Sequence, residues 1–325
     1  MADPAFGAKS VVTLDFESSW GTAKGSPAAK KIAVLTNGIT GTQELIENPT
    51  MRGDFNSSDA INGKKAASGA LTMIPNVDVL PFFVKLLTGG LTTTGAADPY
   101  SHVGKITNVT PLSAVLETSW DIGGTARYSL ASGLRISKWS IPFAADNFLQ
   151  MSVDMMGKDV VVGTTSYGAA GVDWSTGSPL EHLQLASADV KVGGSAVAYV
   201  VSGQIDLDTG LYGDDYRVGG GGARGSLVPG RHKVSGNLKL ALDSTSVMTL
   251  ITGGAASSLE LTWTAGTNRT FNVKVPRIVI QKTQPILQGD GPIFCDCQFR
   301  GSYDGTALSS IVYTIGNGTA GTVYV

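Results

Sequence analysis

The sequence has little charge of either sign. Charged side chains make up 15% of its 325 residues, against roughly 25% in an average soluble protein. The formal net charge of -2 gives the chain no overall attraction to nucleic acid or to an acidic membrane. Any contact with DNA is therefore expected to be passive or local.

Cysteine is scarce as well, and both cysteines lie in one short stretch, FCDCQF. Alternation along a strand places Cys295 and Cys297 on the same face. Neighbouring positions on one face are poorly placed for a disulfide, and two thiols without a nearby His or further Cys make a weak metal site. We expect reduced, structural thiols, and no cofactor or metal.

Signatures of catalysis are missing. No G-x-S-x-G elbow is present, and the cysteines have no neighbouring histidine to activate them. The three histidines, His102, His182 and His232, lack the spacing of metal ligands, and we expect each at the surface or in a turn.

Two carboxylate pairs could in principle do acid/base chemistry, Asp15 with Glu17 and Asp206 with Asp208. Each pair lies two residues apart on one strand, and a solvated strand face is the simpler interpretation. A chain with few charges and no ligand spacing is therefore expected to be a building block and not an enzyme.

Long apolar runs are also absent. The best candidate for a membrane span, LTMIPNVDVLPFFVKLLTGGL, is interrupted by Asp78, Pro81 and Lys85, whereas a spanning helix needs about 20 mostly apolar residues. The first residues, MADPAFGAKSVVTLDF, do not join a basic start to a long apolar run, so no export signal is expected. The sequence predicts a soluble protein made in a cytoplasm.

Glycine and alternating strands are abundant. The 42 glycines separate segments such as VVTLDF, KIAVLT, AVLETSW, LELTWT and TFNVKV, which alternate apolar and polar residues and indicate a mainly β protein. Two segments predict short helices. In DVLPFFVKLLTGG, Asp78 can cap the helix, and an apolar stripe precedes Gly89; the stripe is Leu80, Phe83, Val84 and Leu87. In DSTSVMTLITGG, Asp243 or Ser244 can cap, Gly253 ends the run, and three residues face inward, namely Val247, Leu250 and Ile251.

The order of these elements occurs twice. SGALTM at 68–73 and SGNLKL at 235–240 each precede a helix that ends in Thr-Gly-Gly. A spacing of about 165 residues is too long for a solenoid repeat and indicates a duplicated domain, although a chance echo among glycine-rich strands remains the alternative. We expect a first domain at 1–165, a connector at 166–184 and a second domain at 185–325, each domain a small β-sandwich or barrel with one helix.

A long polar segment interrupts each half. RGDFNSSDAINGKKAA at 52–67 and GDDYRVGGGGARGSLVPGRHKV at 213–234 read as long flexible loops, and loops of that length are usually functional or disordered. The residues that could make contacts there are Arg52, Asp54, Phe55, Asn56, Asp59, Asn62, Lys64 and Lys65 in the first loop, and Asp215, Tyr216, Arg217, Arg224 and Arg231 in the second.

Three stretches of the first half resemble a known family. ESSWGTA at 17–23, TQELIENPTMRGD leading into the first loop, and GKKAASGALTM returning from it are similar to the tail tube (major tail) proteins of long-tailed bacteriophages. The resemblance implies β-sandwich subunits whose inner strands join those of neighbours into a ring with a β-barrel lumen. It also implies that the rings stack into a tube that holds the tape-measure protein and later conducts DNA.

The resemblance sets the remaining expectations. Six domains per ring are usual in the family, so a duplicated chain would form a trimer with pseudo-sixfold symmetry, a hexamer being the alternative. The expected partners are the chain itself, the tape-measure protein, DNA, and the tail terminator and distal tail proteins, with no membrane; the location is the virion, assembled in the bacterial host cytoplasm. The two loops would stack rings, and deletion of 55–64 would leave a folded subunit that forms no tubes. The rival interpretations are a virion decoration or fibre domain and a carbohydrate-binding β-sandwich.

Overall fold

The structure is a computed structural model that describes residues 7–50, 53, 56, 59–144, 148–169, 171–174, 183–196, 199–242, 245–254, 256–285 and 292–324. Its first half contains η1 (Gly7–Lys9), β1 (Val11–Phe16), β2 (Lys30–Ile32), β3 (Thr36–Asn37), β4 (Thr40–Glu47), β5 (Ala60–Met73), α1 (Leu80–Thr88), β6 (Thr92–Thr94), β7 (Tyr100–Lys105), β8 (Ala114–Ile122), β9 (Thr125–Ala144), β10 (Met151–Gly157), β11 (Asp159–Gly163) and β12 (Val172–Asp173).

The second half contains β13 (Gln184–Val192), β14 (Ser195–Ala196), β15 (Val200–Asp208), β16 (Tyr212–Tyr216), β17 (Arg224–Val228), β18 (Lys233–Ala241), α2 (Thr245–Gly253), β19 (Ala256–Thr264), β20 (Thr270–Ile280), β21 (Phe294–Gly301), β22 (Val312–Asn317) and η3 (Gly321–Val323). Within the described residues the chain is mainly β with one short α-helix in each half, as the sequence predicts.

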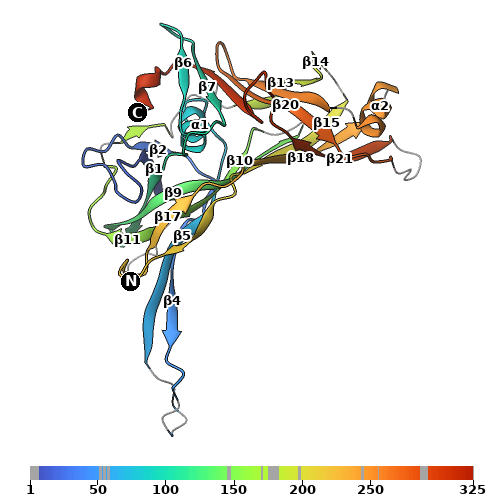
Figure 1. The fold of residues 1–325 in the computed structure, drawn as a ribbon. Coiled ribbons are helices and arrows are strands. Elements are labelled where there is room, and N and C mark those ends of the chain that lie inside the picture. The colour runs from blue at the N-terminus through green and yellow to red at the C-terminus, as the bar shows by residue number, and fades with distance from the viewer. Residues whose placement is uncertain are drawn as a thin grey trace.

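One antiparallel sheet runs through both halves of the molecule. Its strands follow the order β4, β5, β10, β9, β15, β18, β21, with the end of β20 beyond β21. We call this the main sheet. Figure 1 shows it as the band that passes from β5 through β10 to β18 and β21. Among the described residues, the strand pairings do not close it into a barrel.

A second layer of strands packs on each half of the main sheet. In the first half the layer is β2, β1, β8, the start of β9, and β11. In the second half it is β13, β19, β20, β22, and then β7 and β6 from the first half. The two long strands β9 and β20 cross between the layers, which ties each second layer to the main sheet.

Helix α1 packs against β9, β7 and β22, and Figure 1 shows it beside β7. The predicted apolar stripe is buried there, and Gly89 ends the helix with a left-handed φ of 76° and an N–H that donates to the carbonyl of Lys85. Asp78 was wrongly predicted as the cap: Val79 occupies the cap position and makes no side-chain cap hydrogen bond. Packing contributes to the first turn of the helix in place of a cap, because the ring of Phe82 stacks on that of Phe16 with centroids 4.1 Å apart.

A row of aromatic rings joins the cores of the two halves. Trp139 of β9 stacks on Tyr313 of β22 at 5.1 Å, Tyr313 lies 6.4 Å from Phe271, and Phe271 stacks on Trp263 at 5.6 Å. All four rings are buried. Since Trp139 belongs to the first half and the other three to the second, the halves share one continuous core.

Two predictions of solvated polar residues are wrong. Asp15 is buried because the hydroxyl of Tyr167 and the backbone N–H of Ala28 donate to its carboxylate at 3.0 and 2.9 Å. Burial, reinforced by Asp15, raises the pKa of Tyr167. His102 is also buried, where its Nε2 lies 2.9 Å from Oδ1 of Asn317. In both cases the partners are distant in sequence, so no local pattern indicates them.

The remaining predictions on single residues have mixed outcomes. Cys295 and Cys297 are buried free thiols with Sγ atoms 3.6 Å apart, and burial raises the pKa of Cys297 to about 12. In α2 the side chains of Val247 and Ile251 are buried, as predicted. The proposed caps of α2, Asp243 and Ser244, lie outside the described residues, and so does His182.

Candidate functional site: the projecting hairpin and its base

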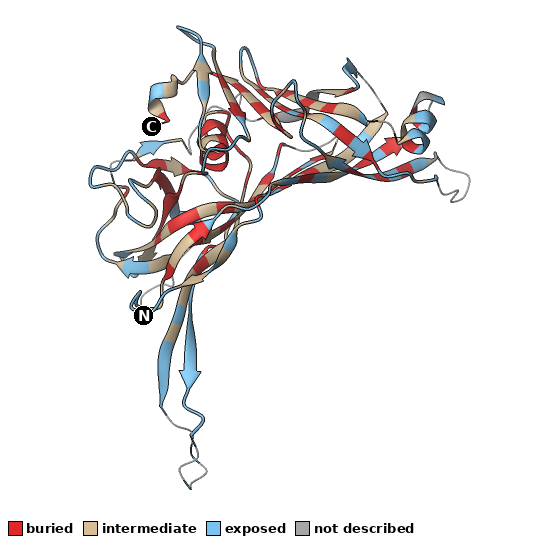
Figure 2. Cartoon of the chain, viewed as in Figure 1, coloured by how far each residue is buried: buried red, intermediate tan, exposed pale blue. Residues whose placement is uncertain are grey.

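The most prominent feature of the surface is a two-stranded hairpin that projects from the body of the molecule (Figure 1). It consists of β4 and the first half of β5, with Ile46 opposite Ile61 and Glu47 opposite Ala60. We call the stretch from residue 43 to residue 65 the arm. Every residue of β4 is exposed, and Figure 2 shows this strand in the colour of exposed residues. The predicted loop at 52–67 is therefore partly wrong, because β5 begins at Ala60.

The arm carries apolar side chains in solvent. Leu45 is 66% exposed, Ile46 46% and Ile61 66%. Ile46 and Ile61 form a cross-strand pair, so their side chains share one face. A two-stranded hairpin alone is at best marginally stable in water, and contiguous exposed apolar residues mark interaction sites. The exposed apolar residues of the arm therefore indicate a contact element.

The second predicted loop is folded onto the base of the arm. Strands β16 and β17 form a separate two-stranded sheet, and the N–H of Lys65 in β5 donates to the carbonyl of Gly222 at 2.7 Å. Gly222 has a φ of 78°, and a Cβ there would lie 2.5 Å from the carbonyl oxygen of Gly63. This close approach requires glycine, so part of the glycine-rich stretch serves packing as well as flexibility.

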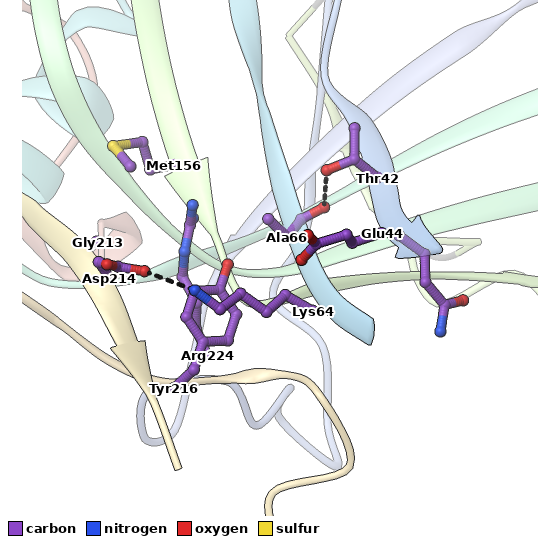
Figure 3. Close-up of a pocket in the computed structure, with 10 residues that line it drawn as sticks. Thr42, Glu44, Lys64, Ala66, Met156, Gly213, Asp214, Tyr216 and Arg224 are labelled. Carbon is purple, nitrogen blue, oxygen red and sulfur yellow. Dashed lines mark hydrogen bonds and ion pairs between the residues drawn. The ribbon is translucent and has the colours of Figure 1, made fainter. Parts of the chain in front are cut away.

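Charged side chains hold this hairpin in place (Figure 3). Lys64 Nζ lies 3.3 Å from the carboxylate of Asp214 and 4.8 Å from the ring centre of Tyr216. The buried guanidinium of Arg224 donates to the carbonyl of Gly157 at 2.9 Å and lies 5.9 Å from the same ring. An open pocket of about 590 Å³ separates this cluster from β4, with Thr42, Glu44 and Met156 among its lining residues. We call β16, β17 and these contacts the brace.

The structure brings together some of the predicted contact residues and separates others. Lys64, Lys65, Tyr216 and Arg224 meet in the brace, whereas Asp215 and Arg217 pair with each other in solvent at 2.9 Å. That pair and Ser226 lower the pKa of Asp215. Asn62 lies in the arm, Asn56 and Asp59 lie between β4 and β5, and Arg231 is exposed before β18. The residues outside the described part are Arg52, Asp54 and Phe55.

Sequence reasoning missed Asp214, Met156 and Gly157, which complete the brace. Asp214 directly precedes the predicted Asp215. The sequence shows that it is an aspartate but not that it pairs with Lys64. Gly157 contributes only a backbone carbonyl, for which the sequence holds no signal.

Removal of the Arg224 side chain should loosen the base of the arm. A hydrogen bond from a charged donor is worth roughly 1.5–3 kcal/mol, and the change would also leave the carbonyl of Gly157 without this donor. We expect Arg224→Ala to lower the melting temperature and to speed amide exchange at Lys64 and Lys65. The matched control is Arg217→Ala, which removes an exposed arginine of the same hairpin and should change neither quantity appreciably. Equal exchange rates in the two variants would contradict the brace.

The open face of the main sheet is polar. Buried and open positions alternate along β10, β9, β15, β18 and β21. Small polar side chains dominate the open positions, such as Ser152, Ser140, Gln204, Ser235, Asn237 and Gln298. The charged residues among them are Lys138, Asp154, Asp206, Asp208, Lys233, Lys239, Asp296 and Arg300. Four carboxylates against four basic groups leave this face close to neutral.

The segment ESSWGTA is a structural clasp in the first half. The carboxylate of Glu17 accepts the backbone N–H groups of Gly21 and Gly133 at 2.7 and 2.6 Å, and Trp20 Nε1 donates to the carbonyl of Gly133 at 3.1 Å. Burial raises the pKa of Glu17 despite these hydrogen bonds. Glu17 therefore fastens the end of β1 to the middle of β9 and, like Asp15, is not a solvated carboxylate.

Within the described residues, these features define a β protein with an extended sheet whose outer margins are unpaired and with a projecting arm that carries exposed apolar residues. Unpaired strand edges are sites at which another chain can pair. A family model described as phage tail tube protein matches residues 7–322. The chain therefore belongs to the phage tail tube protein family, as its resemblance indicates, and is a structural component of a virion. No curated protein matches the chain. Within the described residues, no helix is long and apolar enough to cross a membrane.

Proposed function

We propose that the chain polymerises as stacked rings into the tube of a phage tail and that the tube forms the channel for DNA. The observation that carries this proposal is the main sheet, which has an unpaired margin at β4 and another after β20 within the described residues. Exposed strand margins recruit further strands, and a heterologous contact that closes into a ring satisfies both margins at once.

We propose further that the chain contains two copies of one domain, at 1–165 and 185–325, joined by the connector at 166–184. In the first half the main-sheet order is β4, β5, β10, β9, and in the second half it is β15, β18, β21, β20. In each half the helix follows the second strand of this order. Six domains per ring, as the family implies, then require three chains in a pseudo-sixfold ring.

The arm is the element that we propose reaches the next ring. The arm includes the first half of β5, while Ile74 after the other end of this strand helps to line an apolar hollow of about 300 Å³ together with Ala33, Val34, Leu35 and Phe148. Head-to-tail stacking directs the arm of one ring toward the hollow-bearing face of the next. The brace keeps the second predicted loop at the base of the first, so each chain offers one arm and not two.

The polar open face of the main sheet is the surface that we propose lines the channel. Positive side chains bind phosphate in a salt-dependent way and would slow a moving duplex. A face of serine, asparagine and glutamine whose carboxylates balance its basic groups has no net positive charge to hold phosphate. During assembly the same channel would hold the tape-measure protein, and the ends of the tube would contact the tail terminator and distal tail proteins.

Negative-stain electron microscopy of the purified chain tests the proposal. We expect rings or hollow filaments whose end-on views show three repeats of an asymmetric unit with a central hole. Native mass spectrometry of the ring fraction should give three times the mass of the chain, 33.6 kDa each. A chain that remains monomeric and featureless at high concentration would contradict ring assembly.

A further inference from the structure

The two halves of the chain are joined by a strand pairing that we call the internal seam. Here β9 and β15 run antiparallel, with Ser140 opposite Asp206 and Pro142 opposite Gln204. The N–H of Thr209 donates to the carbonyl of Ser137 at 2.9 Å, so these two residues form a hydrogen-bonded pair of the ladder. Because these pairs alternate in an antiparallel ladder, Ser140 and Asp206 form a non-hydrogen-bonded pair with close side chains.

The segment after β20 corresponds to the part of β9 that forms this seam. Ser68 begins SGALTM and Ser235 begins SGNLKL, so the two serines are taken as equivalent. Ser68 lies opposite Met156 and Ser235 lies opposite Arg300, which aligns Met156 of β10 with Arg300 of β21. In this alignment Asp154 corresponds to Gln298. Lys138 faces Asp154, and the N–H of Gln281 donates to the carbonyl of Gln298 at 2.8 Å, so Lys138 corresponds to Gln281. The sequence KWSIP at 138–142 therefore matches QKTQP at 281–285, and each ends in a proline.

The other margin corresponds to β15. Thr40 lies opposite Ser68, and Asp206 lies opposite Ser235, so Thr40 takes the place of Asp206. The residues from 38 to 42 then match those from 204 to 208. Ile39 and Ile205 occupy equivalent positions, and both are buried.

We propose that residues 281–285 of one chain pair with residues 38–42 of the next chain in the register of the internal seam, so that Thr283 faces Thr40. This inference rests on the proposed ring function and supplies its contact. Lys282 would exchange backbone hydrogen bonds with Gly41, and Gln284 with Ile39. The N–H of Ile39 donates to Oδ1 of Asn37 at 3.0 Å in the single chain and would change partner on pairing. The partner is a second copy of this chain, and three such seams alternate with three internal ones around the ring.

Several features of the free margin fit this pairing. Residues 281–285 follow β20 without a strand assignment, although their counterparts in β9 are fully paired. The N–H of Thr283 is directed inward, to the carbonyl of Ile251 at 3.4 Å, so the alternation leaves the groups of Lys282 and Gln284 for an outer partner. Pro285 has no N–H, and it falls at a position that needs none toward the next chain, as Pro142 does in the internal seam.

The side chains at the two seams differ in a way that permits assembly. Lys138 and Asp206 form an ion pair of 3.4 Å on the open face of the internal seam. At the proposed seam the corresponding residues are Gln281 and Thr40, and Thr283 faces Thr40 across the strands. Uncharged polar pairs of this kind contribute modestly and leave the free margins soluble before the ring closes.

A disulfide across the proposed seam tests the register. Non-hydrogen-bonded pairs have Cα atoms about 4.5 Å apart, within the range that a disulfide spans. We expect Thr40→Cys/Thr283→Cys rings, assembled under reduction and then oxidised, to migrate as covalent trimers in non-reducing gels. Each single variant should remain monomeric in the gel, because the native Cys295 and Cys297 are buried. The matched control is Ile39→Cys/Thr283→Cys, which places one thiol on the opposite face and should not cross-link.

The outcomes separate this inference from the proposed function. Wild-type rings without cross-linking of the double variant in assembled rings would overturn the register and leave the tube function intact. If Thr40→Cys/Thr283→Cys does not assemble, Thr42→Cys/Gln281→Cys tests the same register at the next non-hydrogen-bonded pair, and assembled rings of that variant without cross-links would overturn the register as well. A wild-type chain that forms no rings would overturn the proposed function itself.

Discussion

A chain without the distal part of its arm should fold and form rings but no tubes. The change replaces residues 45–62 with the two-residue turn Asn-Gly, which suits a tight hairpin. It spares Lys64 and Lys65, so the brace contacts with Asp214 and Gly222 remain. Because the removed part of β4 is fully exposed, its loss takes no side chain from the core. Sedimentation and electron micrographs should show a ring fraction of normal yield and no filaments.

The deletion of 55–64 that the sequence suggests is less clean, since it removes part of β5 along with Lys64. A gentler variant separates length from chemistry. Ile46→Ser/Ile61→Ser keeps the arm but removes its apolar pair, and burial of each isoleucine on docking would be worth roughly 1.5–3 kcal/mol. We expect the protein concentration needed for tube growth to rise at least about tenfold, since 1.4 kcal/mol already corresponds to that factor.

The matched control for the arm is Ile122→Ser, which removes an isoleucine of similar exposure from the end of β8, away from the arm. It should polymerise like the wild type. Tubes of normal length from the shortened chain would exclude the arm as the stacking element, and equal effects of the arm and control substitutions would show that general surface apolarity, and not the arm, sets the polymerisation.

The sequence predicts those parts of the fold that a local pattern controls. The helical stripe before Gly89 and the alternation of TFNVKV both report burial within one element, and α1 and β20 lie where expected. The first half of β5 escapes this reasoning. Its residues Ala60–Lys65 are mostly exposed on both faces, so no alternation of apolar residues arises, and the strand depends on its pairing with β4.

Long-range contacts explain the other differences. The second polar segment resembles a flexible loop because of its four consecutive glycines, yet Gly222 closely approaches Gly63, which lies nearly half the chain away in the sequence. Asp15 and His102 are buried for a similar reason, since Tyr167 and Asn317 satisfy them. The type of each residue is visible in the sequence, but the partner that decides between burial and solvation is not.

The proposed duplication of the domain rests on strand register more than on any single motif in this chain. The pairings of β18 with β21 and of β5 with β10 align the halves residue by residue, although few identical residues connect them. The alignment turns the internal seam into a template for the contact between chains. Sequence comparison of the halves locates KWSIP and QKTQP near each other, but only the strand register aligns their prolines with each other.

Reversal of the charge on the open face of the main sheet should convert a passive channel into one that retains DNA. Asp154 of β10 and Asp296 of β21 lie on the open face. Neither carboxylate forms a salt bridge within the described residues. In Asp154→Lys/Asp296→Lys every chain gains two lysines and loses two carboxylates on the proposed lumen surface. We expect normal rings and tubes, because both side chains point away from the core.

The measurement is binding of short duplex DNA to purified tubes at several salt concentrations. Each phosphate that a lysine contacts adds about 0.9 to the slope of log K against log salt, so the lysine tubes should bind DNA tightly at low salt and release it steeply as salt rises. In phage that carry the variant, ejection should slow in the same salt-dependent way. The matched control, Asp154→Asn/Asp296→Asn, removes the acids without adding bases and should bind DNA weakly at every salt concentration. If the lysine tubes bind no more DNA than the asparagine tubes, the open face of the main sheet does not line the channel, since a duplex confined within the tube could not avoid these side chains.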